Sequence, residues 1–147
     1  MDFVYIIKFI FVSLILINIG AVLSGLIISA INRFAISVIK SHKSLLPFII
    51  GVAEILGSFL FVFLVALVFG FIKMGGSIYV IIFYTILLLN NDIGRISNIK
   101  KDRSPVWLLM KLNGEEDSYD KKNDLKKEFF ALFGGLVGLF LGVIYYF

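Results

Sequence analysis

The chain has 147 residues, of which 60% are hydrophobic and 16% charged, and its mean hydropathy is +1.02. An ordinary soluble domain is about half apolar and about a quarter charged, so this composition excludes a water-soluble globule. The formal net charge is +4. In a membrane protein, a surplus of Lys and Arg first determines topology and attraction to anionic lipid. We therefore expect the lipid bilayer as a partner and no direct contact with nucleic acid.

Four apolar stretches predict transmembrane helices. Three of them exceed the roughly 18 residues that indicate a membrane span, and the N-terminal one is too long for a signal peptide and lacks its cleavage pattern. We therefore predict an all-α membrane protein with four transmembrane helices and a loop module at residues 93–128. The predicted spans lie close to residues 4–31, 45–72, 77–92 and 129–147.

The third span is the weakest of the four. Its apolar part, Ser77–Leu89, gives a helix of only ~20 Å, against a hydrocarbon core of ~30 Å. We expect this helix to take Asn90, Asn91 and Asp92 into the membrane, where they must face protein or water. A locally thinned bilayer is the alternative. The tight turn at residues 73–76 predicts an antiparallel hairpin of the second and third spans.

The basic residues predict the topology. Twelve Lys and Arg residues lie in the segments 32–44 and 90–128, and only Lys8 and Lys73 lie elsewhere. The positive-inside rule places both segments in the cytoplasm and both termini outside the cell membrane. Segment 32–44 either continues the first span as a helix or forms an interfacial link, and its plainest role is that of a basic connector.

The segment 90–128 contains local structure signals. Residues 106–112 form a candidate strand, and the Asn113-Gly114 pair that follows predicts a small β-hairpin. Such an element is marginal alone and needs a neighbour, the membrane surface or a partner chain. We expect Trp107, Leu109 and Lys111 to dock a soluble cytoplasmic protein. Further on, Asp120 or Asn123 is expected to cap a helix that runs into the last span.

Glu54 is the only charged residue clearly inside a predicted span. Asn18 lies at a similar depth in the first span, and Ser58 follows Glu54 by one helical turn, so we expect these three residues to form an intramembrane polar cluster. No Lys or Arg within the membrane is predicted to balance the charge of Glu54. A purely structural hydrogen bond between helices explains such a cluster as well as an ion-linked role does.

Small residues recur every four positions in two spans. Gly134, Gly138 and Gly142 lie on one face of the last span, while Gly20 with Ser24, and Ala21 with Gly25 and Ser29, lie on faces of the first. Small faces let helices approach closely in lipid. The two sets of small residues either pack on each other within one chain or join subunits, and we expect a homo-oligomer.

The chain has no cysteine and one histidine, His42, which excludes thiolate chemistry and makes a metal site unexpected. No enzyme motif is present, so we expect neither an enzyme nor a cofactor. The preferred function is a membrane anchor or scaffold that self-associates and docks a soluble partner through residues 90–128. The alternative is an oligomeric ion or proton channel that uses Glu54.

Overall fold

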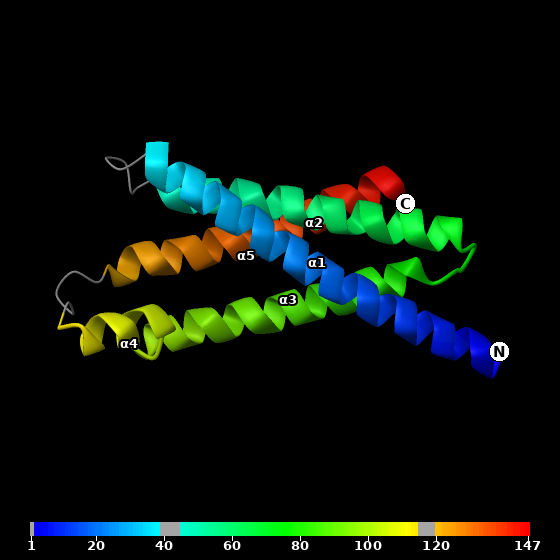
Figure 1. Cartoon of the computed structure of the whole chain (residues 1–147), viewed down its shortest axis with the longest axis horizontal. Coiled ribbons are helices and arrows are strands. Elements are labelled where there is room, and N and C mark those ends of the chain that lie inside the picture. The colour runs from blue at the N-terminus through cyan, green and yellow to red at the C-terminus, as the bar shows by residue number, and fades with distance from the viewer. Residues whose placement is uncertain (1, 39–44, 115–119) are drawn as a thin grey trace.

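The computed structural model describes residues 2–38, 45–114 and 120–147, and the regular structure within these ranges is entirely helical. Four long helices form an elongated bundle, with a short helix between the third and the last (Figure 1). Both termini and the α2–α3 turn lie at one end, here called the terminal end, and the opposite end is called the α4 end. The helices are α1 (Phe3–Val38), α2 (Leu46–Phe71), α3 (Ser77–Lys100), α4 (Pro105–Leu112) and α5 (Lys121–Tyr146).

The four long helices are long and apolar enough to cross a membrane. In lipid, a helix satisfies every backbone N–H and C=O within its own segment, so long apolar stretches adopt this structure. The third helix reaches sufficient length because it continues through Asn90, Asn91 and Asp92 as far as Lys100. The prediction of an all-α chain with four helices able to span a membrane is confirmed.

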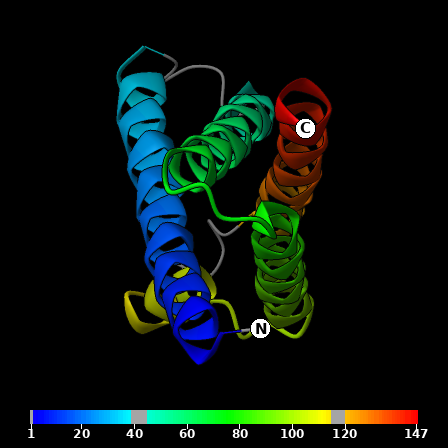
Figure 2. The same cartoon turned by 90° about the vertical axis from the view of Figure 1, so that its right-hand side faces the viewer.

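Helix α2 is the centre of the bundle. It packs against α5 on one side and α1 on the other, and α3 packs mainly on α5. Viewed along the bundle, α1 and α3 stand apart at the two ends of an arc of helices (Figure 2). The turn between α2 and α3 is the predicted tight one, and its last residue, Gly76, has a φ of 87°, which glycine adopts without strain.

The glycine face of α5 is covered by α2. A Cβ atom at Gly134 would strike the carbonyl oxygen of Gly51, and one at Gly138 would strike that of Ile55. At Gly142, an added Cβ would lie 2.7 Å from the Cβ of Val62. The missing side chains therefore allow the two backbones to approach closely within a single chain.

Two small residues of α1, Gly20 and Ser24, also pack on α2. Gly20 is buried under the ring of Phe61, which occupies the space of its absent side chain. One turn further on, the backbone of Ser24 lies against Gly57. Gly20 and Ser24 therefore pack on α2 and not on the glycine face of α5, whereas an added Cβ at Gly25 would meet no atom within 4 Å.

The predicted β-hairpin at residues 106–114 is wrong, because this segment contains α4. Ser104 caps the helix by accepting a hydrogen bond from the backbone N–H of Trp107 (3.2 Å), and Pro105 occupies the first turn. Gly114, with a φ of 72°, follows the helix C-cap Asn113 instead of forming a hairpin turn. A single strand here has no partner strand for its backbone groups, whereas a capped helix satisfies most of them internally.

The ends of the other connecting segments also follow local signals. Asp120 caps α5 by accepting a hydrogen bond from the backbone N–H of Asn123 (3.1 Å), which confirms the predicted capping. The basic connector 32–44 continues α1 as far as Val38. Residues 39–44, His42 among them, lie outside the described residues, as do residues 115–119.

The apolar core fills the terminal half of the bundle. It includes Leu16, Val62, Val65, Phe69, Val80, Ile81 and Leu139. At its inner boundary, the rings of Phe61 and Tyr84 stack with centroids 3.9 Å apart and planes 23° apart. These two rings come from α2 and α3 and separate the core from a polar region nearer the α4 end.

We predict that Gly138→Ala lowers the free energy of unfolding by about 1–3 kcal/mol, because its Cβ forces the backbones of α2 and α5 apart. SDS titration in mixed micelles, followed by near-ultraviolet circular dichroism, measures this change. Gly70→Ala is the matched control, since no atom lies within 4 Å of the added Cβ. Equal stability of both variants would show that the glycine contact is not tight.

Candidate functional site

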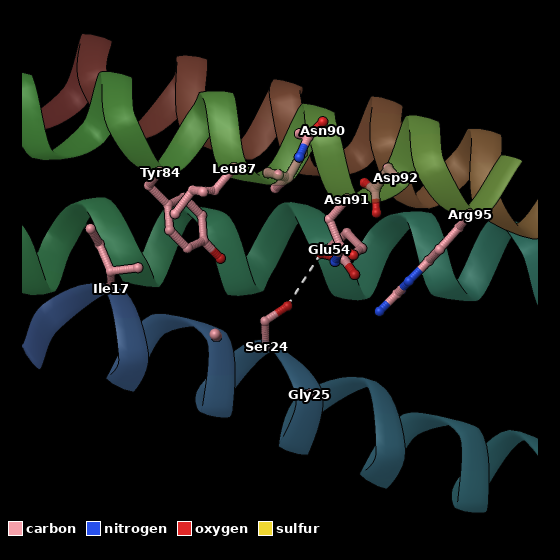
Figure 3. A pocket seen from close by; sticks show the side chains of 12 residues that line it. Ile17, Ser24, Gly25, Glu54, Tyr84, Leu87, Asn90, Asn91, Asp92 and Arg95 are labelled. Atoms are coloured by element: carbon pink, nitrogen blue, oxygen red, sulfur yellow. Dashed lines mark hydrogen bonds between the residues drawn. The ribbon is translucent and has the colours of Figure 1, made fainter. Parts of the chain in front are cut away.

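A cavity of about 500 Å³ lies between α1, α2 and α3, from the middle of the bundle towards the α4 end. Its lining contains polar groups from all three helices, which Figure 3 shows converging on one space. The polar lining residues are Ser24, Glu54, Asn90, Asn91, Asp92 and Arg95, with Tyr84 at the side nearer the apolar core. Such a lining inside an apolar bundle marks a candidate functional site.

Glu54 enters the cavity from α2, about 12 Å along the axis from the first residue of that helix. Its Oε2 atom accepts a hydrogen bond of 3.3 Å from the hydroxyl of Ser24 on α1 (Figure 3). The side chain is half-buried, and a single neutral donor replaces only part of the hydration that a carboxylate loses on burial. Glu54 therefore needs a proton, water or a bound cation.

Asp92 and Arg95 enter the same cavity from neighbouring turns of α3. Asp92 is buried, with 8% of its surface exposed, and it repels the charge of Glu54, whereas Arg95 attracts both carboxylates. Arg95 therefore brings a positive charge close to Glu54, where the sequence predicted none. Two acidic groups and one basic group share the site, so the charges of this trio do not cancel when all are ionised.

Glu128 extends this charged group to α5. It interacts electrostatically with Arg95 and Asp92 and acts on Glu54, although it does not line the cavity. Its Oε2 atom is buried and has no hydrogen-bond partner among the described residues. An unsatisfied buried polar atom costs about 1–3 kcal/mol. The carboxyl groups around the cavity therefore lie in surroundings that solvate them less well than water does.

Aromatic and aliphatic side chains lie between the cavity and the terminal end. Tyr84 forms part of its wall, and the Phe61 ring stacked on Tyr84 also fills the space beside Gly20. Helix α5 lines none of the cavity, and α1 and α3 make only slight contact. Apolar packing of the core therefore bounds the cavity on the side of the terminal end.

The structure brings together only part of the predicted intramembrane cluster. Glu54 lies in the cavity, but Asn18 is exposed and donates its side-chain hydrogen bond to the carbonyl of Leu14 on its own helix (2.7 Å). Ser58 is buried between helices, with its hydroxyl near Gly135 of α5. Ser24, predicted as a helix-packing residue, is the partner of Glu54.

Asp92 and Arg95 are the site residues that sequence reasoning missed as partners of Glu54. The available signal is the spacing of Ile93, Ile96 and Ile99, because apolar residues three apart continue a helix beyond the polar Asn90-Asn91 pair. A helix that includes these isoleucines places Asp92 and Arg95 three residues apart, on neighbouring turns of one face.

The other predicted site residues lie elsewhere. Trp107, Leu109 and Lys111 are on α4, and Lys111 places its Nζ atom 4.8 Å from the centre of the Trp107 ring. No group of three or more His, Cys, Asp or Glu side chains suited to a metal ion occurs in the part of the chain that the structure describes. Comparisons with protein-family models, curated proteins and solved structures give no match to this chain.

We predict that the cavity is reached by water from the α4 end. Ala21 lines the cavity, whereas its neighbour Val22 is exposed outside it, at nearly the same depth. Because the chain has no cysteine, Ala21→Cys and Val22→Cys each introduce a single thiol. A membrane-impermeant maleimide added at the α4 end should label Ala21→Cys at least about tenfold faster, since the reactive thiolate forms only where water solvates it. Equal rates would mean that water does not reach the cavity.

Proposed function

We propose that this protein is a proton-linked membrane protein, in which the Glu54 and Asp92 carboxyl groups take up and release protons within the cavity. The observation that supports this most directly is the convergence of Glu54 from α2 with Asp92 and Arg95 from α3 on one space. Intramembrane carboxyl groups that face a shared cavity are typical of proton and ion pathways. This proposal develops the alternative of an ion or proton channel that uses Glu54.

The proton suits this site better than a metal ion. The described residues offer no group of three or more metal-binding side chains, whereas a proton needs a single carboxyl oxygen and removes the charge that burial penalises. The titratable and charged groups facing Glu54 are Tyr84, Asp92 and Arg95 on α3 and Glu128 on α5. On α1, Ser24 supplies a hydroxyl that accepts and donates hydrogen bonds.

The stacked rings of Phe61 and Tyr84 set the mode of transfer that we favour. Phe61 and Tyr84 stand between the carboxyl groups and the apolar terminal half, so a continuous proton path requires these stacked rings to move apart. We therefore favour gated transfer, with access from one side at a time, over an open pore. The positive-inside rule makes the accessible α4 end the cytoplasmic one, because most Lys and Arg residues belong to it.

Self-association is not required by this proposal. The small faces of α5 and α1 that contain Gly138 and Gly20 are covered by α2, so a homo-oligomer would have to form through other surfaces. The scaffold function predicted for residues 90–128 ranks second, because its β-hairpin is replaced by α4. The leucine side chains of α4 remain exposed in this structure.

The decisive experiment measures proton flux into liposomes that contain the purified protein and a pH-sensitive dye. We expect Glu54→Gln to lower the flux at least about tenfold, because the amide keeps the shape and hydrogen bonding of the side chain but cannot exchange a proton. Asp92→Asn should act in the same direction.

Asp102→Asn is the matched control, because Asp102 is exposed near the start of α4 and pairs there with Lys121 (3.0 Å). It removes the same charge outside the cavity, and its flux should equal that of the native chain. Gel filtration in detergent verifies that all variants remain folded. Native flux in both Glu54→Gln and Asp92→Asn would contradict the proposal.

A further inference from the structure

We propose that α4 lies in the interface of the bilayer that the four long helices cross, with its leucine side chains inserted at the boundary of headgroups and acyl chains. This goes beyond the proton-linked function and does not depend on it. One face of α4 is apolar and exposed. Leu108, Leu109 and Leu112 are 47%, 62% and 82% exposed, and they share an arc of about 100° at 100° per residue.

This leucine face has no protein covering among the described residues. Helix α4 makes at most slight contact with the other helices, although large exposed apolar surfaces usually contact a partner or a membrane. The position of α4 favours lipid as the molecule that covers this leucine face. Only residues 101–104 separate α4 from α3, and its other end leads back to α5. Both neighbours are candidate membrane spans, so α4 is held at the surface of the bilayer.

Beside the leucine face lie two residues that are typical of the headgroup region of a membrane. Trp107 and Lys111 lie one turn apart beside Leu108, and the Lys111 ammonium group is 4.8 Å from the centre of the Trp107 ring. Tryptophan prefers the membrane interface because its ring is apolar and its N–H is polar. Lysine extends its charged end towards water while its methylene groups cover apolar surface. Helix α4 therefore has an apolar face for lipid and an amphipathic border.

Between Lys100 and Gly114, the chain has four basic residues and one acidic residue, Asp102. Asp102 pairs with Lys121 at the start of α5, and the Lys121 ammonium group also donates a hydrogen bond to the carbonyl of Lys100 (3.1 Å). These contacts join the end of α3 to the start of α5 and hold the beginning of the α4 segment beside the bundle. They favour a fixed place at the membrane surface over free extension into water.

The single tryptophan makes the proposal directly testable by fluorescence. The full-length protein is reconstituted into vesicles of phosphatidylcholine and phosphatidylglycerol, with acyl chains brominated near the headgroup, brominated deeply, or not brominated. We expect shallow bromine to quench Trp107 at least about twofold, deep bromine to quench it less, and aqueous iodide to have little effect, as for a helix lying ~5–10 Å into the interface.

A double variant, Leu109→Ser with Leu112→Ser, tests the leucine face itself. Its Trp107 emission should shift towards the red, and quenching by shallow bromine should fall at least about twofold, because the side chains that hold α4 in lipid are lost. Leu67→Ser is the control, since Leu67 is exposed on α2, outside the leucine face. Its fluorescence should match that of the native chain.

Two results would overturn the proposal. If iodide quenches native Trp107 and bromolipid does not, α4 lies in water, and protection by an added soluble protein would then favour the docking function. If neither reagent quenches Trp107, the helix is buried against protein. Because both results are read from the native chain, misfolding of a variant does not affect the outcome.

Discussion

The close approach of α2 and α5 is the constraint on which the rest of the structure depends. Between helices in lipid the hydrophobic effect contributes little, so packing depends on how closely the backbones approach. Gly134 and Gly138 permit this approach, because an added Cβ at either would meet a carbonyl oxygen of α2. With α5 on one side of α2 and α1 on the other, α3 packs mainly on α5 and stands away from α1. The cavity is the space left between α1 and α3.

This arrangement divides the bundle into two chemically different halves. Aliphatic and aromatic side chains fill the terminal half, while Glu54, Asp92 and Arg95 gather in the other. Charged groups inside a membrane are tolerated where they face a common cavity and one another. A polar side chain that faces no cavity behaves differently, as Asn18 illustrates, because it bonds to the backbone of its own helix. Position around the helix axis, rather than depth alone, decides which residues belong to the site.

The sequence predicts those features that depend on local rules. Apolar length identifies the four long helices, and Asp120 is a capping residue by type and position. The β-hairpin prediction failed because its local signals are compatible with two structures. Ser104-Pro105 suits both a turn and a helix start, and Gly114 suits both a hairpin turn and a helix end. The Ser24 to Glu54 contact also escaped prediction. Counting residues gives the position of a residue along the axis of its helix. The face of α1 that turns towards α2 depends instead on the close packing at Gly20 and Gly57.

The order of helices in space differs from their order in the chain, and this has a consequence for biosynthesis. Helix α5 is the main packing partner of α2, yet the ribosome synthesises it after α1, α3 and α4. Until α5 is made, the surface of α2 at Gly51 and Ile55 has no helix packed on it, and the nascent chain cannot form its central contact. Chains fold from the N-terminus as they are synthesised, but the stability of this bundle is acquired late. Chains that still lack α5 therefore expose this surface of α2.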